Sequence, residues 1–180
     1  AVQVGMLKSL LSSMRIAMCE KEGYEADDLI GTLSHAFPET KSIIVTGDRD
    51  AYQLVDEVTD VCLTKTGVSN LLHLTAENFE SEIGYKPEQV IEMKALMGDA
   101  SDNIPGVSGV GEKTARMLID RYQSLEGVYA HLGELGGTLA KRLEEGEESA
   151  RLSRTLATID RSVPLAVSED CGIHIPFSEE

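Results

Sequence analysis

Apolar positions at the start of the chain predict two helices. They recur at helical spacing at Val4, Leu7, Leu11 and Met14. This spacing predicts an amphipathic helix whose apolar face packs against another element. A second helix is expected over residues 26–34. It should end near Phe37, because the proline that follows disfavours helical backbone at that position.

The next apolar runs have the character of β-strands. Residues 42–45 form a short continuous run that is rich in β-branched side chains. Such a run predicts a strand that is buried on both faces of a parallel sheet. Residues 59–64 are a second strand candidate. The first part of the chain is therefore expected to be a βα unit.

The remainder of the chain has helical patterns. Thr75 leads into a short helix, and Pro87 suits the first position of a helix that runs to Leu96. Further helices are expected over residues 112–122, 124–132 and 137–159. We therefore expect a fold of the α/β class in three parts. Residues 1–74 form a βα core, residues 75–165 a helical part, and residues 166–180 an extended tail.

Composition indicates a soluble globular protein of the cytoplasm. The chain has 180 residues, 42% of them hydrophobic, and no apolar run approaches the roughly 20 residues that cross a bilayer. We therefore expect no membrane partner. Cys19, Cys62 and Cys171 are odd in number and form no CxxC pair, which is typical of reduced thiols. The formal net charge of −15 argues against a simple basic surface that grips phosphates.

Three short acidic motifs are candidates for chemistry: EADD with Glu25, Asp27 and Asp28; GDRD with Asp48 and Asp50; and GDASD with Asp99 and Asp102. Single motifs have simpler explanations, because aspartate is common in turns and acids stabilise helix N-termini. Asp99 and Asp102, however, follow a predicted helix, where its dipole makes acids unfavourable. Together the motifs predict a site for two Mg²⁺ or Mn²⁺ ions, which polarise a phosphodiester and activate water.

A glycine-rich stretch, PGVSGVGEKTA, follows the third acidic motif. The glycines precede a predicted helix, so backbone N–H groups and the helix N-terminus can bind an anion without basic side chains. A tight helix-turn-helix without a ligand is the alternative. The spacing does not match a P-loop. We expect contacts with a nucleic-acid backbone from Gly106, Val107, Gly109, Gly111, Lys113 and Thr114.

EADDLIGTLS, VTGDRDAYQLV and MGDASDNIPGVSGVGEKTA, in this order, resemble the 5′-3′ exonuclease and flap endonuclease family, and closely the 5′-nuclease domain of bacterial DNA polymerase I. The resemblance extends to about Leu165. It implies a mixed or parallel sheet flanked by helices, a PIN-like 5′-nuclease core, followed by a DNA-binding helix-3-turn-helix that often holds K⁺. It also implies hydrolysis of DNA at a 5′ flap, nick or 5′ end in replication and repair, with a polymerase domain in the parent chain.

The resemblance also assigns roles to the acids. It places Glu25 and Asp27 nearest a first metal ion. Asp48, Asp50 and Asp102 surround a second ion, with Asp28 and Asp99 acting through water.

The start of the chain departs from this family. The family's first strand with its aspartate, a second aspartate and a basic helical arch are not found before EADD. We therefore expect an N-terminally truncated core with at most trace cleavage of a 5′ flap. The alternative is a non-catalytic module that binds DNA junctions through the glycine-rich turn.

Overall fold

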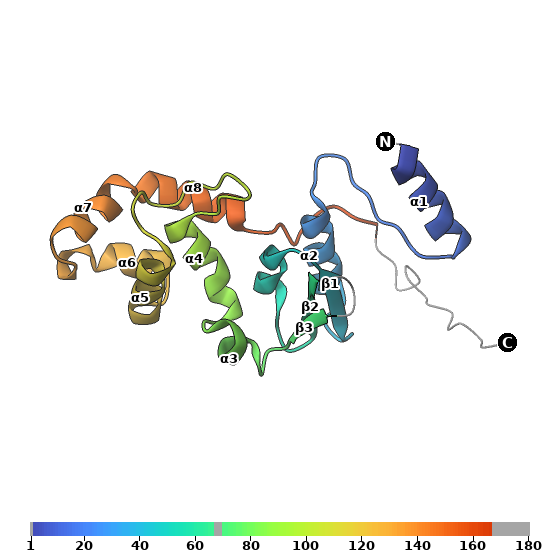
Figure 1. Ribbon diagram of the computed structural model, residues 1–180, viewed down its shortest axis with the longest axis horizontal. Helices are drawn as coiled ribbons and strands as arrows, with labels where there is room; N and C mark the ends of the chain where they lie inside the picture. The colour runs from blue at the N-terminus through green and yellow to red at the C-terminus, as the bar shows by residue number, and fades with distance from the viewer. Residues whose placement is uncertain (1, 67–69, 167–180) are drawn as a thin grey trace. The chain divides into compact units, whose positions relative to one another are not determined.

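The computed structural model describes residues 2–66 and 70–166 (Figure 1). The chain divides into two compact units: Ala1–Phe37 with Asp160–Glu180, and Pro38–Ile159. The predicted tail over residues 166–180, with Cys171, lies outside the described residues except for its first position. Within the described ranges no helix is long and apolar enough to span a membrane.

The first unit contains the two predicted helices, α1 (Val2–Ser13) and α2 (Ala26–Ala36). The expectation that α1 packs against another element is not met, since Val4 and Leu10 are more than half exposed. Met6 and Leu10 widen the predicted stripe into a broad arc, so α1 lacks the narrow apolar face of a packed helix. In α2, Thr32 is buried, and its hydroxyl accepts the Val163 N–H. This bond ties the returning chain to α2.

The second unit begins with a three-stranded mixed sheet of β1 (Ser42–Thr46), β2 (Thr59–Thr66) and β3 (Asn70–Leu74), in that order. β1 and β2 are parallel, with Ile44 opposite Val61, and β2 and β3 are antiparallel, with Val61 opposite Leu74. The pattern predicted β1 and β2 but not β3. Its Leu-Leu-His-Leu core lacks the β-branched residues typical of strands.

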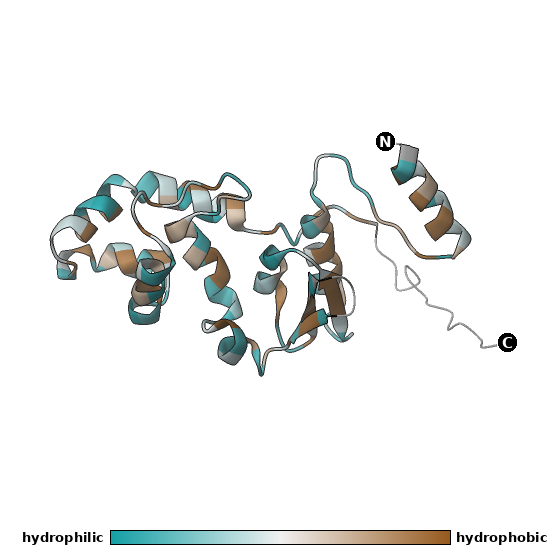
Figure 2. Cartoon of the chain, in the orientation of Figure 1, coloured by the Kyte–Doolittle hydropathy of each residue, from teal (hydrophilic) through white to brown (hydrophobic). Residues whose placement is uncertain are grey.

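One face of this sheet is mostly buried and the other is mostly exposed, although Asp60 on the exposed face is itself buried. Ile44, Val61 and Leu74 point to the buried face, whereas Ile43 and Val45 on the other face are 60% and 63% exposed. Figure 2 shows how strongly hydrophobic these strands are. The prediction that β1 is buried on both faces was wrong. A continuous apolar run does not show which of the two alternating faces will be covered.

Helices make up the rest of the second unit. They are η1 (Arg49–Leu54), α3 (Phe79–Ile83), η2 (Pro87–Gln89), α4 (Val90–Met97), α5 (Glu112–Tyr122), α6 (Leu125–Ala130), η3 (Leu132–Glu134), α7 (Gly137–Glu145) and α8 (Glu147–Ala157). The single helix predicted over residues 137–159 is interrupted at Gly146. An added Cβ there would lie 2.8 Å from the Val107 side chain, so glycine lets the two segments approach.

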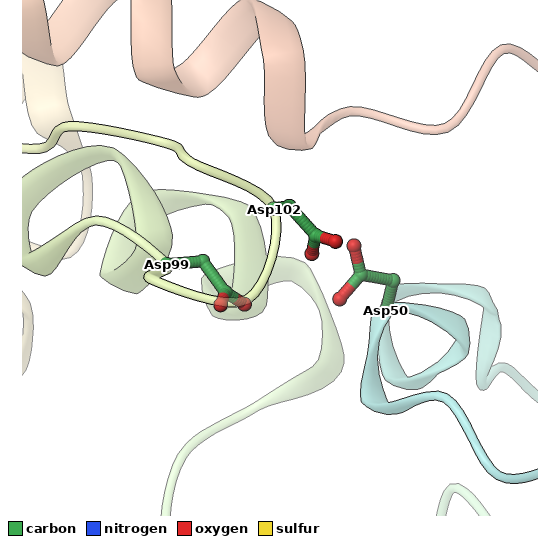
Figure 3. Close-up of side chains that lie close together, drawn as sticks. All are labelled: Asp50, Asp99 and Asp102. Atoms are coloured by element: carbon green, nitrogen blue, oxygen red, sulfur yellow. The ribbon is translucent and has the colours of Figure 1, made fainter.

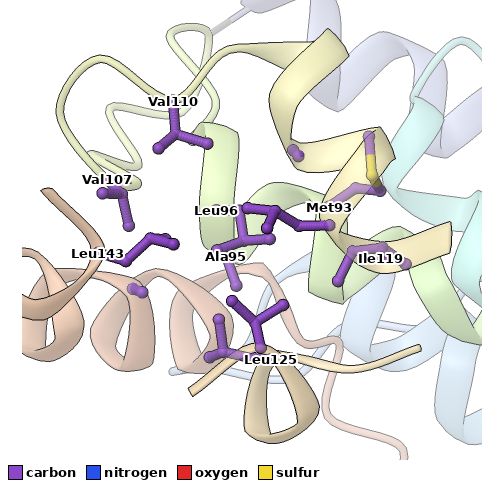
Figure 4. Close-up of a cluster of buried hydrophobic side chains, with 12 residues drawn as sticks. Met93, Ala95, Leu96, Val107, Val110, Ile119, Leu125 and Leu143 are labelled. Carbon is purple, nitrogen blue, oxygen red and sulfur yellow. The ribbon is translucent and has the colours of Figure 1, made fainter. Parts of the chain in front are cut away.

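The core of this unit forms around α4, which packs against α5 and α8 (Figure 4). Its buried members are Met93, Ala95, Leu96, Val107, Val110, Ala115, Leu118, Ile119, Leu125, Val128, Leu143 and Ala150.

Glu92 of α4 is also buried. Its carboxylate accepts the Leu125 N–H at 2.7 Å and pairs with Arg154 at 2.8 Å, which offsets the cost of burying the charge. The resulting scaffold holds both ends of α4.

Truncating the centre of this core should destabilise the protein. Leu96 is fully buried, so Leu96→Ala should lower the free energy of unfolding by about 2–5 kcal/mol through lost burial and an unfilled cavity. Leu152 on α8 is 53% exposed, and Leu152→Ala is the matched control, with an expected change within about 0.5 kcal/mol. Urea denaturation measures both. Equal losses in the two variants would contradict this assignment of the core.

Candidate functional site

The GDRD motif follows directly on β1, as predicted. The Asp48 carboxylate caps η1 by accepting the Asp50 N–H at 2.9 Å, and the Thr46 hydroxyl accepts the Asp48 N–H at 3.0 Å. These bonds hold the loop at the carboxyl end of the strand, where α/β proteins place ligands. Asp50 in the first turn of η1 is left half-buried and faces α4.

The GDASD motif forms a tight turn on the end of α4. Asp99 and Ile104 exchange two backbone hydrogen bonds, of 2.9 and 2.8 Å. Gly98 and Gly106 both have positive φ. A Cβ on Gly98 would lie 2.5 Å from the Ile104 carbonyl oxygen, and one on Gly106 would lie 2.3 Å from the Gly98 nitrogen. Glycine is therefore required at both positions for the turn to fold against the helix end.

Three carboxylates meet at this place. Asp50, Asp99 and Asp102 each offer an oxygen, and the three oxygens lie within 4.8 Å of one another (Figure 3). They come from η1 and from the turn after α4, so segments about fifty residues apart in sequence converge. Close carboxylate oxygens suit hard divalent cations such as Mg²⁺ and Mn²⁺. This set of three of the predicted acids therefore fits a divalent cation.

Lys94 joins two of these carboxylates. Its side chain is 7% exposed, and its ammonium contacts Asp50 and lies 2.7 Å from Asp99 Oδ2. Sequence reasoning missed this residue. The sequence does contain a signal, because two charged residues, Glu92 and Lys94, lie in an otherwise apolar helix. Charged residues in such a run are buried only when they have partners of opposite charge.

The two carboxylates that contact Lys94 are perturbed in opposite directions. Hydrogen bonds from Lys94 and then Ser101 lower the pKa of Asp99 to about 2. Burial raises the pKa of Asp50 and outweighs its bond to Lys94, and the nearby charges of Asp48 and Asp102 add to the rise. Burial alone would lower the pKa of Lys94, but its hydrogen bonds to both aspartates raise it. The ammonium therefore stays charged at neutral pH.

Two acids of this cluster, Asp50 and Asp99, line a cleft of about 1060 Å³ within the second unit. Its lining includes Asp48, Asp50, Asp99, Arg49, Lys65 and Lys94. Within the described part of the chain, Arg49 and Lys65 are exposed and have no carboxylate partner. They are the unpaired cations of this cleft among those residues, and so they are available to an anionic ligand.

The EADD acids belong to the first unit. Glu25 is exposed and precedes α2, where the Asp28 carboxylate accepts the Glu25 N–H at 3.2 Å and the Asp160 N–H at 2.9 Å. Asp28 therefore serves as a helix cap and as an anchor for the returning chain. Asp27 is half-buried in the first turn. Acids at these positions also suit the helix dipole.

The glycine-rich turn combines buried and exposed residues. Gly106 is buried, with its N–H donated to the Ser153 hydroxyl at 2.9 Å and its carbonyl accepting the Ser149 hydroxyl at 2.7 Å. Val107 is 2% exposed and belongs to the core. These two residues hold the turn in place and do not face solvent.

The exposed part of the turn presents backbone N–H groups. Gly109 has φ of +76°, whereas Gly111 is extended and caps α5, so φ requires glycine only at the first of these. Among the described residues, no protein acceptor contacts the N–H groups of Gly109, Gly111 and Lys113. Thr114 is half-buried in the first turn of α5. The N-terminus of α5 is thus open to an anion.

Comparison with solved structures defines the fold as that of 5′-exonucleases. A structure of bacteriophage T5 5′-exonuclease with zinc ions bound matches with a TM-score of 0.68 and 22% identity, covering 78% of this chain and 52% of that one. A complex of the T5 flap endonuclease with DNA and metal ions matches with a TM-score of 0.67 and 22% identity, covering 78% of this chain and 51% of that one.

Sequence comparison shows the family. The N-terminal resolvase-like domain of 5′-3′ exonuclease matches residues 1–84, and its C-terminal SAM fold matches residues 85–176. The chain belongs to the 5′-3′ exonuclease family. It is 42% identical to DNA polymerase I of Caldicellulosiruptor bescii over 92% of this chain, and 41% identical to the 5′-3′ exonuclease of Bacillus subtilis over 91%. It spans 20% and 56% of the lengths of these relatives.

Replacing Asp99 should remove a pH-dependent contribution to stability. The pKa of Asp99 in the folded protein is about 2, below its ordinary value of 3.8. Ionised Asp99 therefore stabilises the fold above about pH 4, and this contribution disappears as the pH falls toward 2. Asp99→Asn should lower the free energy of unfolding by roughly 1–2 kcal/mol near neutral pH and by less near pH 2.5. Urea titrations at both pH values test this, and a constant difference would contradict it.

Proposed function

We propose that this chain is part of a metal-dependent 5′-3′ exonuclease that also cuts 5′ flaps by hydrolysing DNA phosphodiesters. The observation that carries the proposal is the convergence of Asp50, Asp99 and Asp102, of which Asp50 and Asp99 line an open cleft. Family membership supports the reaction class. The proposed substrate is DNA with a 5′ flap, a nick or a 5′ end.

Asp50, Asp99 and Asp102 are proposed to hold a divalent ion, with Asp48 nearby on the same loop. Bound there, Mg²⁺ or Mn²⁺ would polarise the scissile phosphate and lower the pKa of an attacking water. Glu25, Asp27 and Asp28 are proposed as further ligands, direct or through water, as the family resemblance implies. Asp28 also accepts the backbone N–H groups of Glu25 and Asp160.

Two features are proposed to hold the DNA backbone. Arg49 and Lys65 line the cleft as unpaired cations and would contact phosphates beside the acids. The N–H groups of Gly109, Gly111 and Lys113, with the Thr114 hydroxyl, would contact phosphates at the N-terminus of α5. Gly106 and Val107 would support this turn from within the core. We place the boundary between nuclease core and helical DNA-binding part near Leu74, where β3 ends.

Divalent metal should stabilise the folded protein through the acidic cluster. A cation that binds only the folded state adds about 2.7 kcal/mol at a hundred times its Kd, so the melting temperature should rise with added Mn²⁺. Asp50→Asn and Asp102→Asn should each reduce this rise by more than half. Asp120→Asn, on the exposed face of α5, is the matched control and should keep it. Thermal melts over a Mn²⁺ titration measure the effect.

Ionic screening alone could raise the melting temperature of a chain with a charge of −15, so NaCl at matched ionic strength is the second control. Equal rises in wild type, Asp50→Asn and Asp102→Asn would exclude the metal site. Cleavage of a 5′-labelled flap duplex in Mn²⁺ tests the reaction itself. If DNA binding persists and no cleavage depends on Asp102, the chain is the non-catalytic DNA-junction module instead.

The exposed glycine turn should bind duplex DNA without sequence preference. Gly109→Val adds a β-branched side chain at a positive φ and in contact with Arg142, which would displace the backbone N–H groups. Losing one or two such contacts should weaken Kd roughly tenfold at fixed salt. Gly133→Val is the matched control, because its Cβ would meet no neighbour and its φ is not positive. Fluorescence anisotropy measures Kd, and equal affinities of the two variants would remove the turn from the site.

A further inference from the structure

Lys94 is a buried cation in the middle of the acidic cluster. It projects from α4, and its ammonium reaches Asp50 on η1 and Asp99 on the following turn. With only 7% of its side chain exposed, it is shielded from water far more than the exposed lysines of the chain. Lys94 therefore interacts with these carboxylates as a built-in counter-ion rather than as a surface ion pair.

The ligand atoms of Asp99 are already in use. Oδ1 accepts the Ser101 N–H at 2.9 Å and the Ser101 hydroxyl, while Oδ2 lies 2.7 Å from the Lys94 ammonium. Asp50 also directs its Oδ1 at Lys94. A metal ion that used both carboxylates would approach oxygens that an ammonium holds. Two cations at such short range, partly shielded from water, repel strongly.

The charges of the cluster are also compatible with an exchange of the Lys94 ammonium for a divalent ion. Asp50, Asp99 and Asp102 carry three negative charges when ionised, and Lys94 offsets one of them. Without Lys94 the carboxylates would repel one another, and with a divalent ion the ammonium is no longer needed as a counter-ion. The same place thus suits either cation.

We propose that Lys94 occupies the metal site of the metal-free protein and that a divalent ion displaces its ammonium from Asp50 and Asp99. Lys94 thereby offsets the repulsion among the carboxylates of the metal-free protein and lowers their affinity for metal. This inference rests on the proposed metal site. It adds a residue that controls when the site is loaded, since metal binds only at concentrations that outcompete the ammonium.

Metal affinity of a charge-removing variant tests the exchange. Lys94→Met keeps the length and burial of the side chain but removes the ammonium. Mn²⁺ binding followed by electron paramagnetic resonance, which needs no substrate, should give a Kd at least about tenfold tighter than that of wild type. Lys141→Met is the matched control, because it removes the same charge from an exposed position on α7, and its Kd should equal that of wild type.

Each outcome has a separate meaning. Weaker Mn²⁺ binding in Lys94→Met, with binding intact in wild type, would show that Lys94 organises the ligands and would overturn the exchange while leaving the metal site. Equal tightening in Lys141→Met would reduce the effect to net charge and would also overturn it. Absence of Mn²⁺ binding in both wild type and Lys94→Met would overturn the metal site and the exchange together.

A second measurement uses the wild-type chain and does not depend on how Lys94→Met folds. Reductive methylation followed by peptide mass spectrometry should find Lys94 protected without metal and at least several times more reactive at saturating Mg²⁺. Lys141 should react equally in both conditions. Unchanged protection of Lys94 at saturating Mg²⁺ would show that the ammonium stays in place, and would overturn the exchange.

Discussion

The contacts of Lys94 with Asp50 and Asp99 are the interaction on which the rest of the site depends. They connect the loop after β1 to the end of α4, two segments that otherwise belong to the sheet and to the helical core. Glu92, two residues earlier on α4, joins α6 and α8 through the Leu125 N–H and Arg154. An apolar helix thus carries two buried charges, each with partners that offset its desolvation. Removing the partners of Lys94 or of Glu92 would leave an unpaired charge buried in the core.

A backbone contact makes this arrangement possible. Gly98 and Gly106 touch so closely that neither position admits a Cβ, and the turn between them is pressed onto the end of α4. This brings Asp99 back beside Lys94, little more than one helical turn earlier in sequence. The far side of Gly106 is held by Ser149 and Ser153 of α8. The acidic turn and the glycine-rich turn are therefore parts of one packed unit.

The negative net charge of the chain bears on how it could bind a polyanion. At −15, the protein as a whole repels a polyanion, so the proposed binding of DNA requires local features that attract phosphates. The cleft offers Arg49 and Lys65, the N-terminus of α5 offers backbone N–H groups, and a bound divalent ion would add positive charge at the acids. In the proposed function, phosphate binding depends on metal binding, because the acidic cluster without a metal ion repels the phosphate. Lys94 moderates that repulsion in the metal-free protein.

The sequence by itself determined the elements whose signals are local. Residues 112–122 form α5 with the predicted bounds, and β1 and α2 begin and end within a few residues of expectation. As predicted, EADD lies at the start of α2, and GDRD and GDASD follow β1 and α4. The family was also readable, because its three motifs occur in order. Only the tertiary structure decided that β3 pairs with β2, that one face of β1 stays exposed, and that Gly146 divides the last helix against Val107. It also decided that Lys94 meets Asp50. Strand pairing, burial and ion pairs depend on which distant segments share a surface, and the spacing of residues within one segment carries no record of that.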